Sequence, residues 1–146
     1  MFIERDILDR ALKSIEKNKV LVILGARRTG KTVLLKQIRN AQSRKSLMLN
    51  GEDFAVREIL ERRTVENYKS LIGDNELLII DEVQKVPEIG IILKLMIDEL
   101  DGLSIIVTGS SAFDIENAFG EPLTGRKKTI YLFPFSEKEF RLNENI

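Results

Sequence analysis

Short, mainly apolar segments recur along the chain between longer segments in which apolar residues are spaced for a helix. Unbroken apolar runs predict strands that are buried on both faces of a sheet. The five predicted strands are Val20–Leu24, Ser46–Asn50, Leu77–Ile80, Ile105–Val107 and Thr129–Phe133. The spacing elsewhere predicts helices over Ile7–Ile15, Leu34–Ala41, Phe54–Ile72 and Ile89–Leu100.

Polar residues and glycine mark where these helices begin, break and end. We expect a break near Thr64 inside the segment Phe54–Ile72. We expect Gly102 to cap the helix Ile89–Leu100. The segment from Ser136 onward begins like a capped helix. Alternating strand and helix signals are typical of an α/β domain with a mainly parallel sheet.

The composition is that of an ordinary globular chain and excludes several kinds of chemistry. The chain has 146 residues, enough for one domain over 1–146, and its 23 basic residues balance its 23 acidic ones. It has no cysteine and no histidine, which excludes thiol catalysis, imidazole acid–base chemistry and metal sites built on either residue. No apolar run reaches the length of a bilayer span, so we expect a cytoplasmic protein with no membrane partner.

A glycine-rich loop follows the first predicted strand and matches the pattern G-x-x-x-x-G-K-[ST] without a gap. Its residues are Gly25, Ala26, Arg27, Arg28, Thr29, Gly30, Lys31 and Thr32, with Val33 next in the following helix. Backbone N–H groups of such a loop form an anion nest, and the helix that begins near Lys31 adds its positive end. We therefore assign all nine residues to nucleotide binding, with Lys31 on the outer phosphates and the Thr32 hydroxyl on magnesium.

An acidic pair, Asp81-Glu82, ends the third predicted strand. Bound magnesium needs a carboxylate partner, so we assign Asp81 to the metal together with Thr32. Glu82 is then placed to orient and polarise an attacking water, which favours hydrolysis over phosphoryl transfer to a small molecule. The chain has no N-K-x-D string for reading guanine, so we expect ATP as the nucleotide.

Several other polar residues are weaker candidates. Thr108 or Ser110, after the fourth strand, is expected to sense the terminal phosphate or to place water; alternatively the Thr-Gly-Ser turn satisfies its own backbone. Arg126 is expected to contact phosphate in cis, to act across an interface as an arginine finger, or to be a solvated loop residue. Gln84 is expected to help hold water.

Two further groups of basic residues can be interpreted in more than one way. The side chains of Arg27 and Arg28 are placed either to touch phosphates or to face a partner. Lys127 and Lys128 are most simply read as a solvated strand start.

Together these motifs resemble the AAA-type ATPases, within the additional-strand catalytic-glutamate division of P-loop proteins. The closest likeness is to an archaeal and bacterial group whose ATPase core normally precedes a nuclease-like domain of unknown function. The strings that carry the resemblance are Gly25–Thr32, Asp81–Gln84, Val107–Ser111, Leu123–Arg126 and Phe133–Ser136. The first two are widely shared, the other three are more specific, and the likeness extends from Ile3 to Phe140.

The resemblance implies a P-loop NTPase sandwich of three layers, with a five-stranded sheet in the order 5-1-4-3-2, and ATP with Mg²⁺ as ligands. Members of this group usually continue well beyond the fifth strand. We therefore expect this chain to be either an excised ATPase core or a short member of the group.

Three functions are consistent with these features. The first is a magnesium-dependent ATPase core that drives or switches a partner domain. The second is a nucleotide-binding module with little turnover, which fits the lack of a recognisable lid. The third is a motor or repair factor linked to nucleic acid, which the balanced charge does not support.

Overall fold

The sheet is the centre of the fold, and a computed structural model describes it within residues 5–26, 30–110, 119 and 121–132. Its five parallel strands lie in the order β2-β3-β4-β1-β5. The strands are β1 (Val20–Leu24), β2 (Ser46–Asn50), β3 (Leu77–Asp81), β4 (Ser104–Gly109) and β5 (Lys127–Tyr131). This is the order 5-1-4-3-2 read from the other edge, so the predicted α/β architecture and strand order are confirmed.

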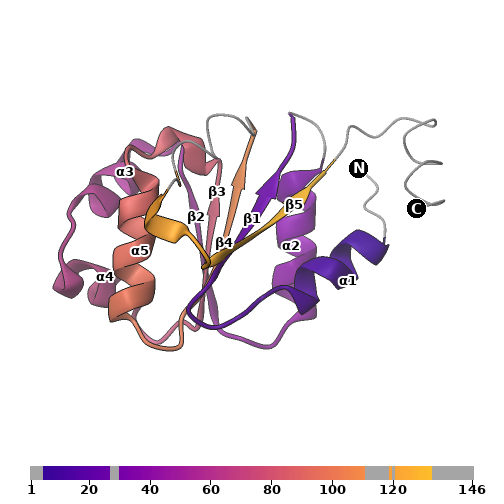
Figure 1. Ribbon diagram of the computed structural model, residues 1–146, viewed down its shortest axis with the longest axis horizontal. Coiled ribbons are helices and arrows are strands. Elements are labelled where there is room, and N and C mark those ends of the chain that lie inside the picture. Colours follow the sequence, from indigo (N-terminus) through magenta and orange to yellow (C-terminus); the bar gives the residue numbers. More distant parts are fainter. Residues whose placement is uncertain (1–4, 27–29, 111–118, 120, 133–146) are drawn as a thin grey trace.

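Helices cover both faces of this sheet, which completes the three layers (Figure 1). The helices are α1 (Arg5–Lys13), α2 (Lys31–Ala41), α3 (Phe54–Glu61), α4 (Val65–Ile72) and α5 (Ile89–Glu99), with short 3₁₀ turns η1 (Val83–Lys85) and η2 (Glu121–Leu123). Helices α1 and α2 lie on one face, and α3, α4 and α5 lie on the other. Within the described ranges, no helix reaches the length and apolar character that crossing a bilayer requires.

Side chains of the central strands alternate between two apolar cores. Val22 and Leu24 of β1 pack with the core under α4 and α5, whereas Leu21 and Ile23 pack with the core under α1 and α2. Every residue of β1, β3 and β4 is buried, because helices cover both faces there. The central strands are thus held on both faces by the cores. The polar residues of the candidate site follow at the ends of these strands.

The break expected near Thr64 is present and divides the segment into α3 and α4. The Thr64 hydroxyl caps α4 by accepting a hydrogen bond from the Asn67 backbone N–H at 3.1 Å. One turn further, the buried Tyr68 hydroxyl donates to the Leu60 carbonyl at 2.6 Å, so the two helices are joined. Burial raises the pKa of Tyr68, and the nearby Arg63 opposes that shift.

Several predicted boundaries were wrong by a few residues. Helix α1 ends at Lys13, so Ile15 joins the core from beyond the helix. Helix α5 ends at Glu99 with Leu100 as its cap, and Gly102 instead adopts a left-handed conformation (φ 83°) in the turn before β4. Strand β5 begins at Lys127 rather than Thr129. The tail from Ser136 lies outside the described residues.

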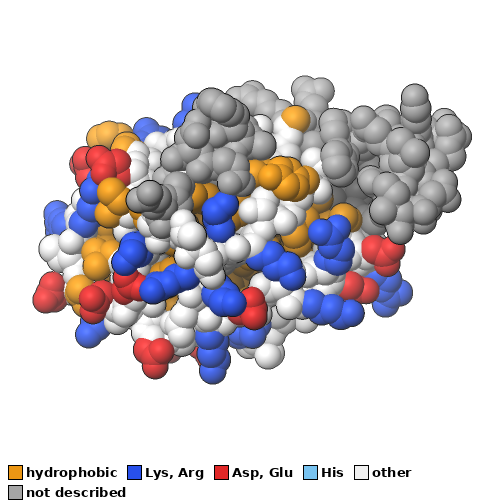
Figure 2. Space-filling view, in the orientation of Figure 1, with side chains coloured by type: hydrophobic (Ala, Val, Ile, Leu, Met, Phe, Trp, Pro, Cys, Tyr) orange, Lys and Arg blue, Asp and Glu red, His pale blue; other side chains and the backbone are white. Residues whose placement is uncertain are grey.

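Basic side chains spread across the visible face of the molecule, with carboxylates between them (Figure 2). Lys94 and Arg126 both pair with Asp98, and Lys19 pairs with Glu16. These three basic side chains are therefore compensated locally. Charge distribution on this face does not by itself mark a nucleic-acid site.

Candidate active site

The candidate site lies where strands β1, β3 and β4 end, at one edge of the sheet. The register places Leu24 beside Gly109 and Ile80 beside Val107, so the loops after these strands begin at nearly the same level. The Gly25 backbone N–H donates to the Gly109 carbonyl at 3.1 Å. This bond joins the end of β4 to the start of the loop Gly25–Thr32, which we call the phosphate loop after its expected ligand. Ligands bind at this carboxyl edge in open parallel sheets.

Lys31 is the buried cation of the loop. It opens α2 directly after Gly30, which adopts a left-handed conformation (φ 90°) that favours glycine. Its ammonium donates to the Gly25 carbonyl at 2.6 Å and to the Ala26 carbonyl at 3.3 Å. The Lys31 Nζ also lies 3.7 Å from Oε1 of Glu82. The charge of this lysine, which is only 5% exposed, is therefore balanced by the carboxylate opposite it.

The remaining loop residues are placed in part. Thr32 and Val33 lie in the first turn of α2, where Thr32 is exposed and Val33 half-buried. Arg27, Arg28 and Thr29 lie outside the described residues. Their assignment to nucleotide binding stays a prediction.

Two oxygen donors of the kind that magnesium prefers lie side by side at the end of β3. The Thr32 hydroxyl donates to Oδ2 of Asp81 at 2.9 Å, and Asp81 itself is buried. In the described part of the chain, no group of three or more acidic residues forms a cage of its own for a metal. One carboxylate and one hydroxyl fit Mg²⁺, which keeps several waters and shares the phosphates of its nucleotide.

Thr108 holds this acidic pair in place. Its fully buried hydroxyl donates to Oδ1 of Asp81 and accepts a hydrogen bond from the Glu82 backbone N–H at 3.0 Å. A hydroxyl has one proton to donate, and Thr108 gives it to Asp81. In this arrangement Thr108 has no proton left to donate to a terminal phosphate.

Gln84 lies between Glu82 and Ser110. Its side-chain Nε2 donates to Oε2 of Glu82 at 2.6 Å and to the Ser110 hydroxyl oxygen at 2.9 Å. The sequence singled out all three residues but did not predict that they form one connected chain. Among the residues that the structure describes, the Glu82 carboxylate is contacted by the Lys31 ammonium and by the Gln84 amide.

The Glu82 backbone is held in an uncommon conformation by the loop after β2. Glu82 has a positive φ of 54°, which is unusual for a residue other than glycine, asparagine or aspartate. Gly51 packs directly against it: a Cβ atom on Gly51 would lie 2.4 Å from the Glu82 carbonyl oxygen. The Gly51 N–H also donates to the Asp81 carbonyl at 2.7 Å. Sequence reasoning missed Gly51, whose only signal was a glycine directly after a predicted strand.

We expect Gly51→Ala to displace Glu82, because the added methyl group collides with backbone rather than with a flexible side chain. Overpacking of this kind costs about 1–3 kcal/mol of folding stability. Urea unfolding measures that loss, and the expected ATP turnover, measured on the folded fraction, reports the displacement of Glu82. Gly73→Ala is the control, since Gly73 also has a positive φ (57°) but has open space around it. The two variants should both be less stable, and only Gly51→Ala should turn over more slowly; equal turnover would contradict the coupling.

Arg126 lies at the opposite edge of the sheet from the phosphate loop. Its carbonyl accepts a hydrogen bond from Val20, the first residue of β1, at 2.9 Å, and its guanidinium donates to Asp98 of α5. Strand β1 spans about 13 Å between that point and the loop, since strands rise roughly 3.3 Å per residue. The structure therefore does not support contact between Arg126 and phosphate in cis. Its action in trans stays a prediction.

Asp98 links α5 to the segment before β5. Hydrogen bonds from Lys94, and then from Arg126, hold the pKa of the Asp98 carboxyl below its usual range. This ionic cluster gives Arg126 a structural partner. The pairing ties the last residue of the Leu123–Arg126 string to α5.

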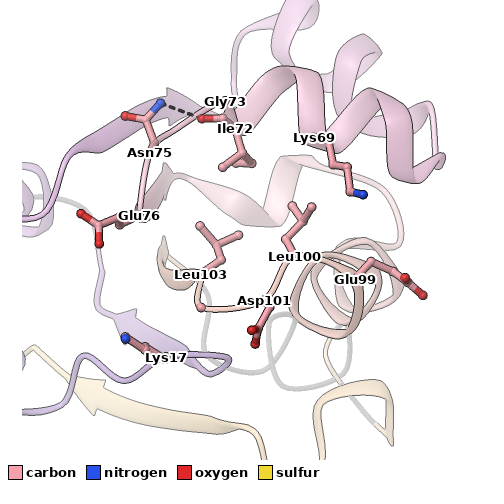
Figure 3. Close-up of a pocket in the computed structure, with 11 residues that line it drawn as sticks. Lys17, Lys69, Ile72, Gly73, Asn75, Glu76, Glu99, Leu100, Asp101 and Leu103 are labelled. Atoms are coloured by element: carbon pink, nitrogen blue, oxygen red, sulfur yellow. Dashed lines mark hydrogen bonds between the residues drawn. The ribbon is translucent and has the colours of Figure 1, made fainter.

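A cavity of about 620 Å³ opens at this same amino edge, between the ends of α4 and α5 (Figure 3). Lys17, Lys69, Glu76 and Asp101 line it, so amines and carboxylates are mixed. Asn75 closes one side by donating to the Ile72 carbonyl at 2.8 Å. Neither Lys31 nor Asp81 lines the cavity, so it is separate from the candidate site at the carboxyl ends of the strands.

Comparison with known proteins supports the fold and the family of this chain. The model of an AAA domain family matches residues 17–141. The uncharacterised protein MJ1544 of Methanocaldococcus jannaschii is 31% identical over an alignment of 126 residues, which covers 84% of this chain and 28% of that protein. An uncharacterised protein of Haemophilus influenzae is 27% identical over 159 residues, covering 100% of this chain and 39% of that protein. The chain thus spans well under half the length of these relatives.

Solved structures share the fold at low sequence identity. The Walker-type ATPase PABY2304 of Pyrococcus abyssi superposes with a TM-score of 0.62 at 17% identity, over 99% of this chain and 59% of that one. A katanin structure gives 0.61 at 16% identity, over 91% and 51%. The Pif1 helicase of Candida albicans gives 0.60 at 17% identity, over 99% and 44%. These likenesses show that the sheet and its helices have the arrangement of P-loop ATPases.

Proposed function

Because this chain belongs to the AAA domain family, we propose that it binds ATP with Mg²⁺ at the loop Gly25–Thr32 and hydrolyses it. The observation that carries the proposal is the meeting of three parts at one sheet edge. Lys31 lies 3.7 Å from Glu82, and Thr32 lies 2.9 Å from Asp81. A phosphate-binding cation, a pair of magnesium donors and a second carboxylate are the parts that hydrolysis of a nucleoside triphosphate needs.

Each residue has one role in the proposed reaction. Lys31 exchanges its loop carbonyls and Glu82 for the outer phosphates, which carry more negative charge. Asp81 and Thr32 hold Mg²⁺, which when bound neutralises charge on the phosphates. Glu82 orients the attacking water and accepts its proton. Thr108 holds Asp81 and Glu82 in position through its hydrogen bonds to the Asp81 carboxylate and the Glu82 N–H.

One observation favours a second candidate, a nucleotide-binding module with little intrinsic turnover. In this structure the Glu82 carboxylate is already engaged by both Lys31 and Gln84. A carboxylate so engaged is less available to water until nucleotide draws Lys31 away. The relatives are more than twice as long as this chain, so we also propose that the ATPase core drives or switches a further part of the protein.

Magnesium removal is the direct test of the proposal. The purified chain is expected to release phosphate from ATP in the presence of Mg²⁺ and to stop when EDTA is added, because Asp81 and Thr32 alone leave the phosphate charge uncompensated. Equilibrium binding of a fluorescent ATP analogue is measured in parallel, and GTP serves as the control nucleotide. Mg²⁺-dependent binding without phosphate release supports the second candidate. Phosphate release that EDTA does not change contradicts both.

A further inference from the structure

The side-chain amide of Gln84 occupies a position that neither the phosphate loop nor the magnesium pair explains. It projects from the 3₁₀ turn η1, directly after the acidic pair, and reaches Ser110 at the end of β4. Its Nε2 joins the Ser110 hydroxyl to Oε2 of Glu82, at 2.9 and 2.6 Å. One amide therefore connects the proposed general base to the strand beside the phosphate loop.

The orientation of this amide follows from its neighbours. Nε2 carries two protons, and the carboxylate and the hydroxyl take both. If the amide were turned over, its carbonyl oxygen would face the Glu82 carboxylate and repel it. The other amide atom, Oε1, is buried and accepts no hydrogen bond from the described residues. Both amide protons are therefore committed to Glu82 and Ser110, which fixes the orientation of the amide.

Ser110 and Thr108 use their hydroxyls differently within the described residues. Thr108 gives its only proton to Asp81. Ser110 accepts from Gln84, and within the described residues its own proton is not donated to any acceptor. Ser110 also follows Gly109, whose carbonyl holds the Gly25 N–H at the first residue of the phosphate loop.

We propose that Gln84 is a positioning residue, which fixes the Glu82 carboxylate and makes its placement depend on Ser110. The inference rests on the proposed function, since it assigns Glu82 to hydrolysis. When phosphate draws Lys31 away from Glu82, Gln84 remains the carboxylate's side-chain donor. A displacement of Ser110, or of the Gly25–Gly109 hydrogen bond beside it, then displaces the Glu82 carboxylate through the Gln84 amide.

The kinetic test replaces Gln84 by residues of similar size that lack its donor. Gln84→Met is expected to lower kcat by about 10- to 100-fold, as loss of an outer-shell partner typically does, and to leave the Kd for ATP unchanged. Gln84→Glu, which places a second carboxylate against Glu82, should lower kcat further. In a Glu82→Gln background, Gln84→Met should have no additional effect. Gln42→Met is the matched control, because the side-chain bonds of Gln42 to the described residues are to the backbone of Arg44.

A spectroscopic test decides the linkage without requiring turnover. The ¹³C carboxyl signal of Glu82 is followed in the nucleotide-free protein, with thermal melts to confirm that each variant is folded. Ser110→Ala is expected to displace this signal in the parent and to leave it in place in Gln84→Met. Equal displacement in both backgrounds, or none in the parent, overturns the proposal. If the parent chain hydrolyses no ATP, the proposed function fails, and this cycle still confirms or overturns the role of Gln84.

Discussion

Glu82→Gln is expected to bind ATP with Mg²⁺ as tightly as the parent and to hydrolyse it about 10²- to 10⁴-fold more slowly, the usual contribution of a general base. The amide keeps the size of the side chain and still offers an oxygen to the Nε2 of Gln84. It carries no negative charge, so it neither polarises water nor accepts its proton. Single-turnover phosphate release measures the rate, and calorimetry measures the affinity.

The control for this substitution is Glu88→Gln. Glu88 is an exposed glutamate at the start of α5, where it pairs with Arg63 at 3.2 Å. The ion pair of Lys31 is with Glu82 and not with Glu88, so both rate and affinity of Glu88→Gln should stay at parent values. Hydrolysis by Glu82→Gln at the parent rate would falsify the role given to Glu82. Loss of ATP binding would instead make its charge part of the phosphate site.

Much of the fold was predictable because its strands are buried on both faces. Val20–Leu24 and Leu77–Ile80 are apolar at every position. Short apolar runs between segments with helical spacing are typical of buried strands in a parallel sheet. Boundaries were less predictable where tertiary contacts set them. Ile15 continues the apolar spacing of α1 but lies beyond the end of that helix. Its side chain is buried in the core without being helical, so the spacing alone does not show where the helix ends.

The centre of the candidate site was predictable because its residues are close in sequence or end a strand. The glycine-rich loop with Lys31 and Thr32 is one continuous stretch of sequence, and the Thr32 hydroxyl donates to Asp81 at 2.9 Å, so the predicted pair is close together. Its assignment to magnesium stays a prediction. The supporting residues were not predictable in the same way. The sequence left Thr108 and Ser110 as equal alternatives, and only the hydrogen bonds across 26 and 27 positions separate them.

Gly51 and Arg126 both show that contacts between neighbouring strands cannot be predicted from local sequence. Gly51 contacts Glu82 because β2 lies beside β3, a neighbour relation that no local pattern encodes. Arg126 belongs to a string that resembles a functional motif, but the start of β5 is paired with the start of β1 and lies far from the loop. In both cases the strand order, rather than the residue type, decides which side chains meet.

Lys31→Ala is expected to weaken ATP binding by about 10- to 100-fold, since a hydrogen bond to a charged group contributes roughly 1.5–3 kcal/mol. The ammonium is the buried cation of the loop, and it already lies against the Gly25 carbonyl and Glu82. Its removal takes away the positive charge that attracts the outer phosphates and leaves the Glu82 carboxylate with Gln84 as its side-chain partner. Calorimetric titration with ATP and Mg²⁺ measures the loss.

Two further variants separate charge from packing at this position. Lys31→Met keeps most of the buried stem and removes only the ammonium, so it should lose affinity as far as Lys31→Ala does while unfolding at a higher temperature. Lys36→Ala, an exposed lysine on the same helix, should bind ATP like the parent. If Lys31→Met retained parent affinity, the loop would be binding phosphate through its backbone N–H groups alone. The buried pairing of Lys31 with Glu82 would then serve stability rather than nucleotide recognition.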